Sequence, residues 1–372
     1  MRCVLIAGTK GKGSTAAFLA ALLCAAGIRA GLYTQPHLQV YRERMRVDGV
    51  MVGPAEFAAA VDQWRPRVAR LRERHPEAGE PTTFEITTAL ALTLFADTGC
   101  SVAVLEVGLG GRLDATNAVE PEISILTTID RGHTAILGTT LERIAREKAG
   151  ILRSARPALI ARQRASVRRT LMTACRDVGA RCEWVDPLPA PTAIGLPGAH
   201  QRQNAALAVA AAAALGVPVA LRALERLRWP GRFEIVEGDG SRIVLDGAHD
   251  AASARALADE LAAQGDRSTQ LVIGMYRDKE ASRILRPLLP FAARVLVTRP
   301  GGARALPAAD LARTCRALTR MPVETYEDVG RALEAARVGA GGRTICVTGS
   351  LALVGEARDH LGLAPAERLW AG

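Results

Sequence analysis

The sequence has few aromatic residues and no long apolar run, and each shortage argues against a class of protein. Phe, Trp and Tyr make up 4% of the 372 residues, so no stacking surface for nucleic-acid bases is evident despite a formal net charge of +10. Apolar runs such as 205–215 stop short of the roughly 18 residues of a membrane span. The start of the chain lacks the apolar core of a secretion signal. We therefore expect a cytoplasmic protein that binds neither nucleic acid nor membrane.

The seven cysteines are scattered, and none has the spacing of a zinc site or of a redox pair. Even the closest two, Cys175 and Cys182, are seven residues apart. We interpret them as buried thiols in a reducing compartment.

Lysine is also rare, because only four of the 48 basic residues are lysines: Lys10, Lys12, Lys148 and Lys279. A chain that uses arginine almost everywhere keeps lysine where a compact ammonium with an adjustable pKa is needed. Two of the four lie in one glycine-rich loop, which marks this loop as a candidate functional site.

The order of apolar segments predicts two α/β domains. Strands are expected at 3–7, 30–34, 101–106, 123–129 and 158–161, with helices at 15–26, 84–98, 141–149 and 205–215. After a turn signal at Trp229-Pro230-Gly231 the alternation begins again, with strands at 243–245, 270–273, 294–297 and 344–347 and helices at 252–263, 282–289 and 329–337. Such alternation is typical of parallel sheets covered by helices on both faces. We place the domains at 1–230 and 231–372.

The glycine-rich loop, Gly8-Thr9-Lys10-Gly11-Lys12-Gly13-Ser14, connects a predicted strand to a predicted helix. In this position backbone N–H groups and the positive end of the helix surround an anion. Lys12 would reach the outer phosphates of a nucleotide. The strict P-loop pattern is broken, because Ile6 stands at its first glycine and Gly13 follows the lysine. We predict a variant phosphate-binding loop.

Three further residues are candidates for the same site, two of them at or after the ends of predicted strands and one on a predicted helix. Glu106 ends a strand at the sheet edge where ligands of open α/β folds bind, and a carboxylate there suits a magnesium ion on ATP. His133 follows the strand at 123–129, and Lys148 lies on a helix near Glu142 and Glu147. A structural histidine and a solvated ion pair remain the alternatives for these two.

The motifs and their order resemble the folylpolyglutamate synthase/dihydrofolate synthase family of the Mur ligase superfamily. The resemblance covers nearly the whole chain, and its most specific parts are Leu105 to Asn117 and Arg146 to Ile151. The other segments that carry it are the glycine-rich loop, Leu32 to Leu38, Phe84-Glu85, Trp229 to Glu234, Asp246-Gly247-Ala248-His249 and Thr348 to Leu351.

This resemblance implies an ATP-dependent amide ligase, with an N-terminal P-loop-type ATPase domain and a smaller C-terminal Rossmann-like domain. The cofactors would be ATP and Mg²⁺, and the substrates L-glutamate and a pteroate or folate, joined through an acyl phosphate. The implied ATP contacts are Thr9, Gly11, Lys12, Gly13, Ser14, Asn204, Arg232 and Asp246. The implied metal ligands are Glu106, His133 and Gln35. The implied catalytic residues are Lys12, His249 and Lys148, the last of which matches a lysine that is carbamylated. The implied pterin site contains Gly110, Arg112, Asp114 and Asn117.

The sequence departs from the family pattern at Gln35, where a serine is usual, at Gly132, where a carboxylate is usual, and at Lys10 and Asp250, where asparagines are usual. The family also has a few dozen residues before the first strand. Two alternatives stay open: a Mur-type ligase for another acid and amine, and an ATP-binding protein without catalysis. We expect a monomer.

Overall fold

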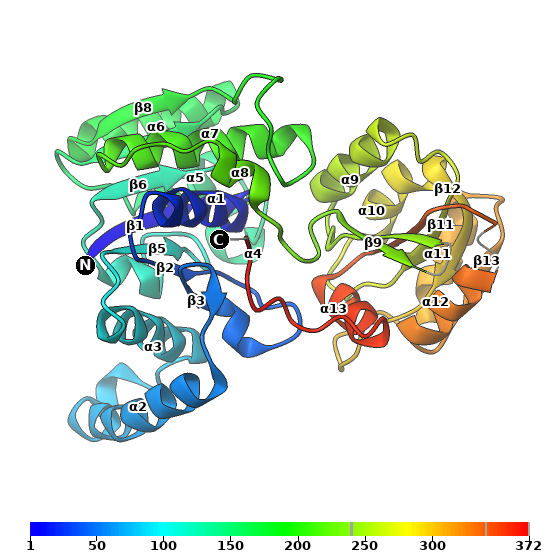
Figure 1. Cartoon of the computed structure of the whole chain (residues 1–372), viewed down its shortest axis with the longest axis horizontal. Coiled ribbons are helices and arrows are strands. Elements are labelled where there is room, and N and C mark those ends of the chain that lie inside the picture. Colours follow the sequence, from blue (N-terminus) through cyan, green and yellow to red (C-terminus); the bar gives the residue numbers. More distant parts are fainter. Residues whose placement is uncertain (239–240, 339–340, 371–372) are drawn as a thin grey trace.

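The computed structural model describes residues 1–238, 241–338 and 341–370 and contains two sheets, one in each domain. Figure 1 shows the two domains side by side, joined by extended segments. The N-terminal sheet has the strand order β4-β3-β2-β5-β1-β6-β7-β8, and the C-terminal sheet has the order β13-β12-β11-β14-β10-β9. The expected α/β architecture with two domains is confirmed.

The N-terminal sheet is built around β1 (Arg2–Ala7), which pairs in parallel with β5 (Val102–Glu106) and β6 (Ile123–Leu126). The remaining parallel strands are β2 (Ala30–Tyr33), β7 (Pro157–Ala161) and β8 (Arg181–Val185). An antiparallel edge is added by β3 (Met45–Val47) and β4 (Val50–Met51). The central strands are buried on both faces, which explains their continuous apolar runs.

Helices cover both faces of this sheet (Figure 1). One core contains α1 (Lys12–Ala25), α7 (Ala199–Ala214) and α8 (Arg222–Arg226). The other contains α3 (Thr83–Asp97), α5 (Leu141–Ala149) and α6 (Ala165–Val178). The short helix α4 (Thr134–Leu137) and the 3₁₀ turns at 41–44, 76–78 and 115–118 complete this domain.

The C-terminal sheet has five parallel strands, β10 (Ser241–Leu245), β11 (Thr269–Ile273), β12 (Ala292–Val297), β13 (Val323–Thr325) and β14 (Ile345–Thr348), with β9 (Glu234–Gly238) antiparallel at one edge. Its two cores are completed by α9 (Ala251–Ala263), α10 (Ala281–Leu288), α11 (Ala308–Leu318), α12 (Val329–Val338) and α13 (Leu351–His360), with a 3₁₀ turn at 289–291.

The chain crosses between the domains twice, once before β9 and once after α13. The segment after α13 returns to the N-terminal domain, where the amide of Met51 donates to the carbonyl of Glu367 over 2.8 Å and Trp370 joins the core under α1. The amide of Arg228 donates to the carbonyl of Leu369 over 2.8 Å, so the two crossings lie side by side. Both covalent connections between the domains therefore pass through one location.

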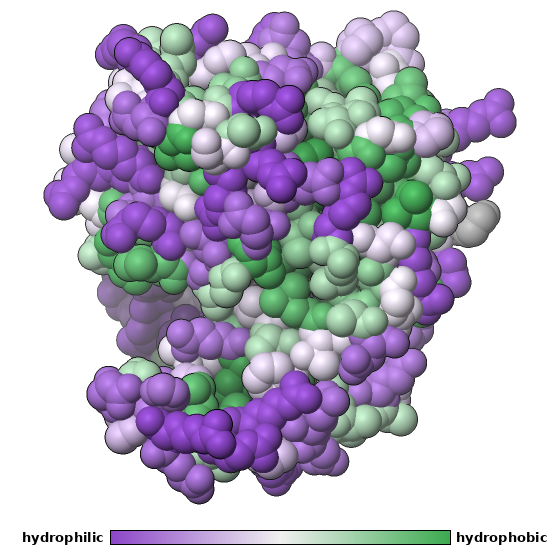
Figure 2. All heavy atoms as spheres, turned by 90° about the vertical axis from the view of Figure 1, so that its left-hand side faces the viewer, coloured by the Kyte–Doolittle hydropathy of each residue, from purple (hydrophilic) through white to green (hydrophobic). Residues whose placement is uncertain are grey.

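The longest helix, α2 (Pro54–Arg74), was not predicted. Ala60 is its only buried residue, and the helix otherwise exposes polar and charged side chains. Figure 2 shows hydrophilic side chains gathered at the bottom of the molecule, the end at which Figure 1 places α2. Phe57, Val61 and Trp64 do recur at helical spacing and pack against the core, but a proline inside the segment, Pro66, argues against a helix when only the sequence is known. Also unpredicted are α4, α6, α8, α11, α13, β3, β4, β8, β9 and β13, while α7 begins at Ala199, six residues before the predicted start.

The interpretation of all cysteines as thiols is wrong for one pair. Cys175 of α6 and Cys182 of β8 form a disulfide, with their Cα atoms 6.3 Å apart. The turn at Gly179, which takes a left-handed conformation, brings the end of the helix back along the next strand. The other five cysteines are free. Within the described part of the chain, no helix has both the length and the apolar character needed to cross a membrane.

Candidate active site

The glycine-rich loop connects β1 to α1, as predicted. Gly11 takes a left-handed conformation (φ +87°) directly before α1, and no side chain caps the N–H groups of the first turn. Uncapped N–H groups at the positive end of a helix favour an anion. In the same turn, Thr15 Oγ1 is buried without a hydrogen-bond partner among the described residues. These features fit a phosphate group.

Glycine is required at two positions of this loop because neighbouring side chains pack directly against it. A Cβ at Gly8 would lie 1.8 Å from Thr127 Oγ1, and a Cβ at Gly11 would lie 2.1 Å from Asn204 Oδ1. Both glycines also have positive φ angles. Asn204 of α7, more than 190 residues away in the sequence, therefore lies against the loop.

Glu106 and Lys12 face each other across the loop. Lys12 Nζ lies 3.8 Å from Glu106 Oε1, and the Gln35 amide donates to Glu106 Oε2 over 3.1 Å. Burial raises the pKa of the Glu106 carboxyl, and the charge of Lys12 opposes this rise. The side-chain amide of Gln35 donates to the carbonyl of Glu106 over 3.5 Å. Three predicted residues are thus brought together at the end of β5.

Lys148 is buried (4% exposed), and its ammonium donates to the carbonyl of Gly8 over 2.8 Å. Burial, together with the nearby charge of Lys12, lowers the pKa of Lys148 to about 7. The interpretation of a solvated ion pair is therefore wrong. At neutral pH a large fraction of this amine is neutral, and a neutral amine is nucleophilic.

The loop after β6 is attached to the glycine-rich loop by Thr9. The hydroxyl of Thr9 donates to the carbonyl of Asp130 over 2.9 Å, and the Asp130 amide in turn donates to that hydroxyl over 3.0 Å. His133 follows in an exposed position with a left-handed backbone (φ +52°). Although the residue is exposed, neighbouring protein atoms remove part of the hydration of its ring, which lowers the pKa of His133, and so do the positive charges of all four lysines, Lys12, Lys148, Lys279 and Lys10. The rare lysines of the chain therefore gather around this site.

The C-terminal domain contributes the loop after β10. Asp246 accepts hydrogen bonds from the amides of Phe233 (2.8 Å) and Ala248 (2.9 Å). Burial raises the pKa of Asp246, and the charge of Arg232 opposes the rise. Arg232 also acts on Glu106, so it lies at the seam between the domains.

His249, on the same loop, is neutral at pH 7. Its Nδ1 lies 2.8 Å from the carbonyl of Gly247, which makes Nδ1 the protonated nitrogen of the neutral ring. Burial, followed by the charge of Lys10, lowers the pKa of His249 to about 4. Nε2 is therefore the nitrogen that can accept a proton.

The predicted substrate loop is held by its own polar side chains. Asp114 accepts from the amides of Leu109 and Thr116, and Asn117 donates to two backbone carbonyls. Arg112 forms an exposed ion pair with Glu147. The loop contains one feature that sequence reasoning missed, because Leu113 is 80% exposed.

A second exposed apolar residue lies close to this loop. Ile136 of α4 is 71% exposed. A Cβ at Gly110, which has a positive φ of 71°, would lie 3.1 Å from Leu137 Cδ2, so the loop and α4 are in contact. Contiguous exposed apolar surface marks interaction sites, and these two side chains add apolar surface to adjoining segments. Only the folded chain reveals this pair.

A metal ion at the seam would need further ligands beside the few ligand side chains that lie there. Among the described residues, no three His, Cys, Asp or Glu side chains are grouped to hold a metal. Mg²⁺ is commonly held by one or two carboxylates together with substrate phosphates. Glu106 beside a phosphate-binding loop fits this pattern.

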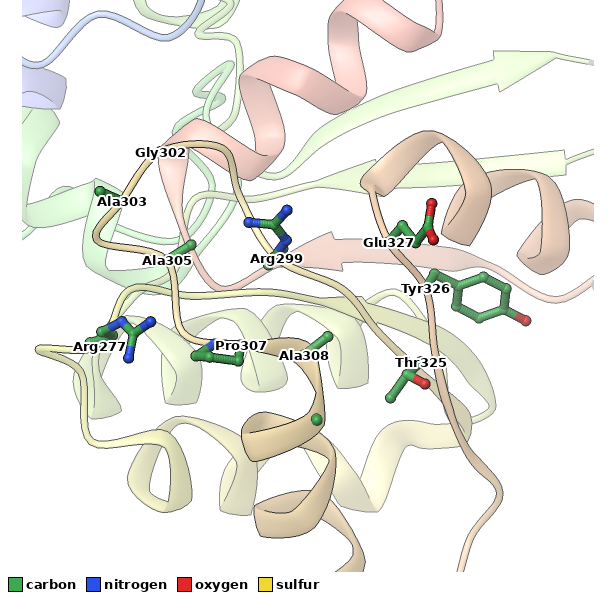
Figure 3. Close-up of a pocket in the computed structure, with 11 residues that line it drawn as sticks. Arg277, Arg299, Gly302, Ala303, Ala305, Pro307, Ala308, Thr325, Tyr326 and Glu327 are labelled. Atoms are coloured by element: carbon green, nitrogen blue, oxygen red, sulfur yellow. The ribbon is translucent and has the colours of Figure 1, made fainter.

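A cavity of about 510 Å³ lies elsewhere in the C-terminal domain, at the ends of β12 and β13 (Figure 3). Figure 3 shows Arg277 and Arg299 on one side and Thr325, Tyr326 and Glu327 on the other. None of its lining residues is a predicted site residue.

Comparisons with known proteins find matches to both domains of the chain. Residues 6–181 match the Mur ligase middle domain, and residues 231–351 match the Mur ligase, glutamate ligase domain. A dihydrofolate synthase/folylpolyglutamate synthase of Bacillus subtilis is 32% identical over 97% of this chain and 90% of its own. A probable bifunctional folylpolyglutamate synthase/dihydropteroate synthase of Halobacterium salinarum is 36% identical over 96% of this chain, which spans 46% of that longer protein.

Solved structures resemble the chain over nearly its whole length. The folylpolyglutamate synthase of Mycobacterium tuberculosis complexed with ADP and AMPPCP superimposes with a TM-score of 0.91 at 32% identity, covering 98% of this chain and 92% of that one. The bifunctional enzyme of Yersinia pestis complexed with AMPPNP and Mn superimposes with a TM-score of 0.84 at 31% identity, covering 97% and 89%.

Proposed function

Because the chain belongs to the folylpolyglutamate synthase/dihydrofolate synthase family of ATP-dependent ligases, we propose that it joins L-glutamate to dihydropteroate, to folyl-glutamate, or to both, through an acyl phosphate. In this proposal residues 1–230 bind ATP and the acid, residues 231–372 bind the amine, and the enzyme is a cytoplasmic monomer. The convergence of Lys12, Glu106 and Lys148 on one phosphate-binding loop is the observation that carries the proposal.

The first step needs charge neutralisation more than a base. The carboxylate of the acid is already ionised at pH 7, so its attack on the γ-phosphate of ATP is limited by repulsion and alignment. The uncapped N–H groups of α1 and the ammonium of Lys12 oppose that negative charge. Gly11, Gly13 and Ser14 belong to the same turn, and Thr9 holds the turn to the loop of His133.

Magnesium would be held by Glu106 and His133, with Gln35 and a carbamylated Lys148 as further oxygen ligands. A bound Mg²⁺ ion neutralises phosphate charge and aligns the phosphoryl group for transfer. The pKa of about 7 supports carbamylation of Lys148, because only the neutral amine adds to CO₂ and the product is an anionic oxygen ligand. The amide oxygen of Gln35 is a weaker ligand than a carboxylate.

The nucleotide would lie across the seam. Asn204 lies against the glycine-rich loop, while Arg232 and Asp246 belong to the C-terminal side. Closure of the seam would exclude water and protect the acyl phosphate from hydrolysis. Nε2 of the neutral His249 ring could accept the proton that the amine of glutamate loses, but a pKa of about 4 makes this ring a weak base.

The acid would bind beside the loop of Gly110, Arg112, Asp114 and Asn117. The exposed side chains of Leu113 and Ile136 favour an aryl or pterin ring there. Since Asp114 bonds within the loop and Asn117 bonds to backbone carbonyls of the loop and of Gly150, they would shape this site rather than supply its free polar groups.

Release of ADP by the purified protein tests the proposal. We expect ADP only when ATP, Mg²⁺, a pterin acid and L-glutamate are all present, and a glutamylated product in equal amount by mass spectrometry. With hydroxylamine in place of glutamate, the acyl phosphate should be trapped as a hydroxamate. Arg162→Ala, in an exposed ion pair with Asp186, is a control that should keep full activity.

Two other outcomes would favour the alternatives. ADP release with another acid and amine, but with no pterin acid, indicates a Mur-type ligase of different specificity. ATP affinity without turnover for any pair indicates a nucleotide-binding protein that lacks catalysis. Either result would exclude glutamylation of folates as the function of this protein.

A further inference from the structure

Lys10 and Asp250 form an ion pair across the domain seam, although 240 residues separate them in the sequence. Lys10 lies in the glycine-rich loop of the N-terminal domain, and Asp250 directly precedes α9 in the C-terminal domain. The two side chains are 34% and 37% exposed. Sequence reasoning did not connect these residues, because nothing local relates them.

Each oxygen of the Asp250 carboxylate has a separate role. Oδ1 caps α9 by accepting from the amides of Ala252 (3.1 Å) and Ser253 (2.9 Å). Oδ2 accepts from the ammonium of Lys10. Burial opposes ionisation of Asp250, but the charge of Lys10 and the hydrogen bonds from Lys10 and the Ser253 amide together outweigh it, so the pKa of Asp250 is lowered. One carboxylate therefore fixes the start of a helix and receives a cation from the other domain.

The pair connects the two halves of the candidate site. Asp250 ends the loop that contains Asp246 and His249, and His249 Nε2 lies 4.0 Å from Asp250 Oδ2. Lys10 is anchored at its backbone, where its amide donates to the carbonyl of Thr128 over 3.2 Å. Lys10, itself held by its backbone hydrogen bond, therefore helps to fix the position of the 246–250 loop next to the glycine-rich loop.

The contact also lies apart from the two covalent connections between the domains. The two chain crossings lie side by side at Arg228 and Leu369, whereas Lys10 and Asp250 meet at the phosphate-binding loop. A hinge rotation about the crossings would open or close this contact.

We propose that Lys10 and Asp250 are positioning residues that hold the closed arrangement of the two domains, with the 246–250 loop placed over the bound phosphates. This inference rests on the proposed ligase function. It assigns the pair no direct contact with the reacting atoms.

A double-mutant cycle tests this coupling, with Lys10→Met and Asp250→Asn as the single variants. Asparagine keeps an oxygen for capping α9, so Asp250→Asn removes charge without removing the cap. For a pair that is one-third exposed and bridges an interface, we expect each single variant to lower kcat about fivefold. The KM for ATP should stay within about twofold, because the phosphate-binding turn is unchanged in the open form.

The double variant should be no slower than either single variant, since both remove the same contact. Raising the salt concentration should reduce the advantage of the wild type over the variants. Asp186→Asn, in the exposed ion pair with Arg162, is the matched control and should show neither effect. The proposal would be overturned if the loss of kcat in the double variant equalled the product of the losses in the two single variants. It would also be overturned if the KM for ATP rose in Lys10→Met alone.

Small-angle scattering separates this inference from the proposed function. Wild-type protein with AMPPNP and Mg²⁺ should be more compact than without them, and Asp250→Asn should lose much of this compaction. If the wild type makes no ADP but the compaction depends on Asp250, the ligase proposal fails and the domain contact stands. If AMPPNP and Mg²⁺ compact the wild type and Asp250→Asn equally, the ion pair does not hold the domains closed.

Discussion

Replacement of Lys148 by methionine should remove catalysis while making the fold more stable. The side chain is 4% exposed, and its pKa is lowered from 10.5 to about 7. That drop corresponds to on the order of 5 kcal/mol of unfavourable free energy for the protonated amine. Methionine has a similar length and carries no charge, but it loses the hydrogen bond to the Gly8 carbonyl, which is worth about 1 kcal/mol.

The pH dependence follows from the sign of the shift. Between about pH 7 and 10.5 the unfolded chain binds the Lys148 proton and the folded chain does not, so the free energy of unfolding rises with pH in this window. Below pH 7 the folded state carries the full cost. The stability gained by Lys148→Met should therefore be largest at or below pH 7 and vanish towards pH 10.5.

Carbamylation adds a second pH effect, on activity. At pH 7.5 about three quarters of an amine with a pKa near 7 is neutral, against roughly one in a thousand for an ordinary lysine. Activity of the wild type should rise as the pH passes through about 7. It should fall after removal of dissolved CO₂ and return on addition of bicarbonate.

The assays are ADP release in degassed and bicarbonate-containing buffer, and chemical unfolding at several pH values. Lys148→Met should be inactive in both buffers and more resistant to urea than the wild type at pH 6.5. Half or more of wild-type turnover in the variant, or lower stability at pH 6.5, would refute this reasoning.

Three further predictions follow from the structure. Lys12→Ala should abolish ATP turnover while the protein stays folded, shown by an unchanged far-UV circular dichroism spectrum, because the ammonium of Lys12 faces Glu106 across the glycine-rich loop and is not part of the apolar core; unchanged turnover would exclude its phosphate role. Gly11→Ala should weaken ATP binding by about tenfold or more, measured by calorimetry, because its Cβ would lie 2.1 Å from Asn204 Oδ1. The unfolded, unreduced protein should titrate five thiols rather than seven, and reduction should recover the other two.

Much of the fold could be predicted because the strands are buried on both faces. The runs at 3–7 and 101–106 became β1 and β5, and the glycine-rich loop lies between β1 and α1 as expected. The failures have the opposite cause. Residues 54–74 fully bury only Ala60 and contain Pro66, so the helix α2 was missed although its partly buried apolar residues recur at helical spacing.

Individual site residues could be named from the sequence, but not their surroundings. Glu106 was placed at a strand end and lies there, whereas the burial that lowers the pKa of Lys148 to about 7 required the packed protein. Asp114 and Asn117 were identified as substrate residues, and the structure shows their side chains bonded within the loop.

The sequence by itself determined where most strands, turns and helix starts of this protein lie. These features depend on residues close together in the chain, because neighbouring residues set the backbone hydrogen bonds and the spacing of apolar side chains. Only the tertiary structure decided which distant groups meet. Lys10 forms an ion pair with Asp250, 240 residues away in the sequence, and Cys175 forms a disulfide with Cys182 across a turn. Such contacts arise from the packing of whole domains, and packing also sets the burial that shifts a pKa.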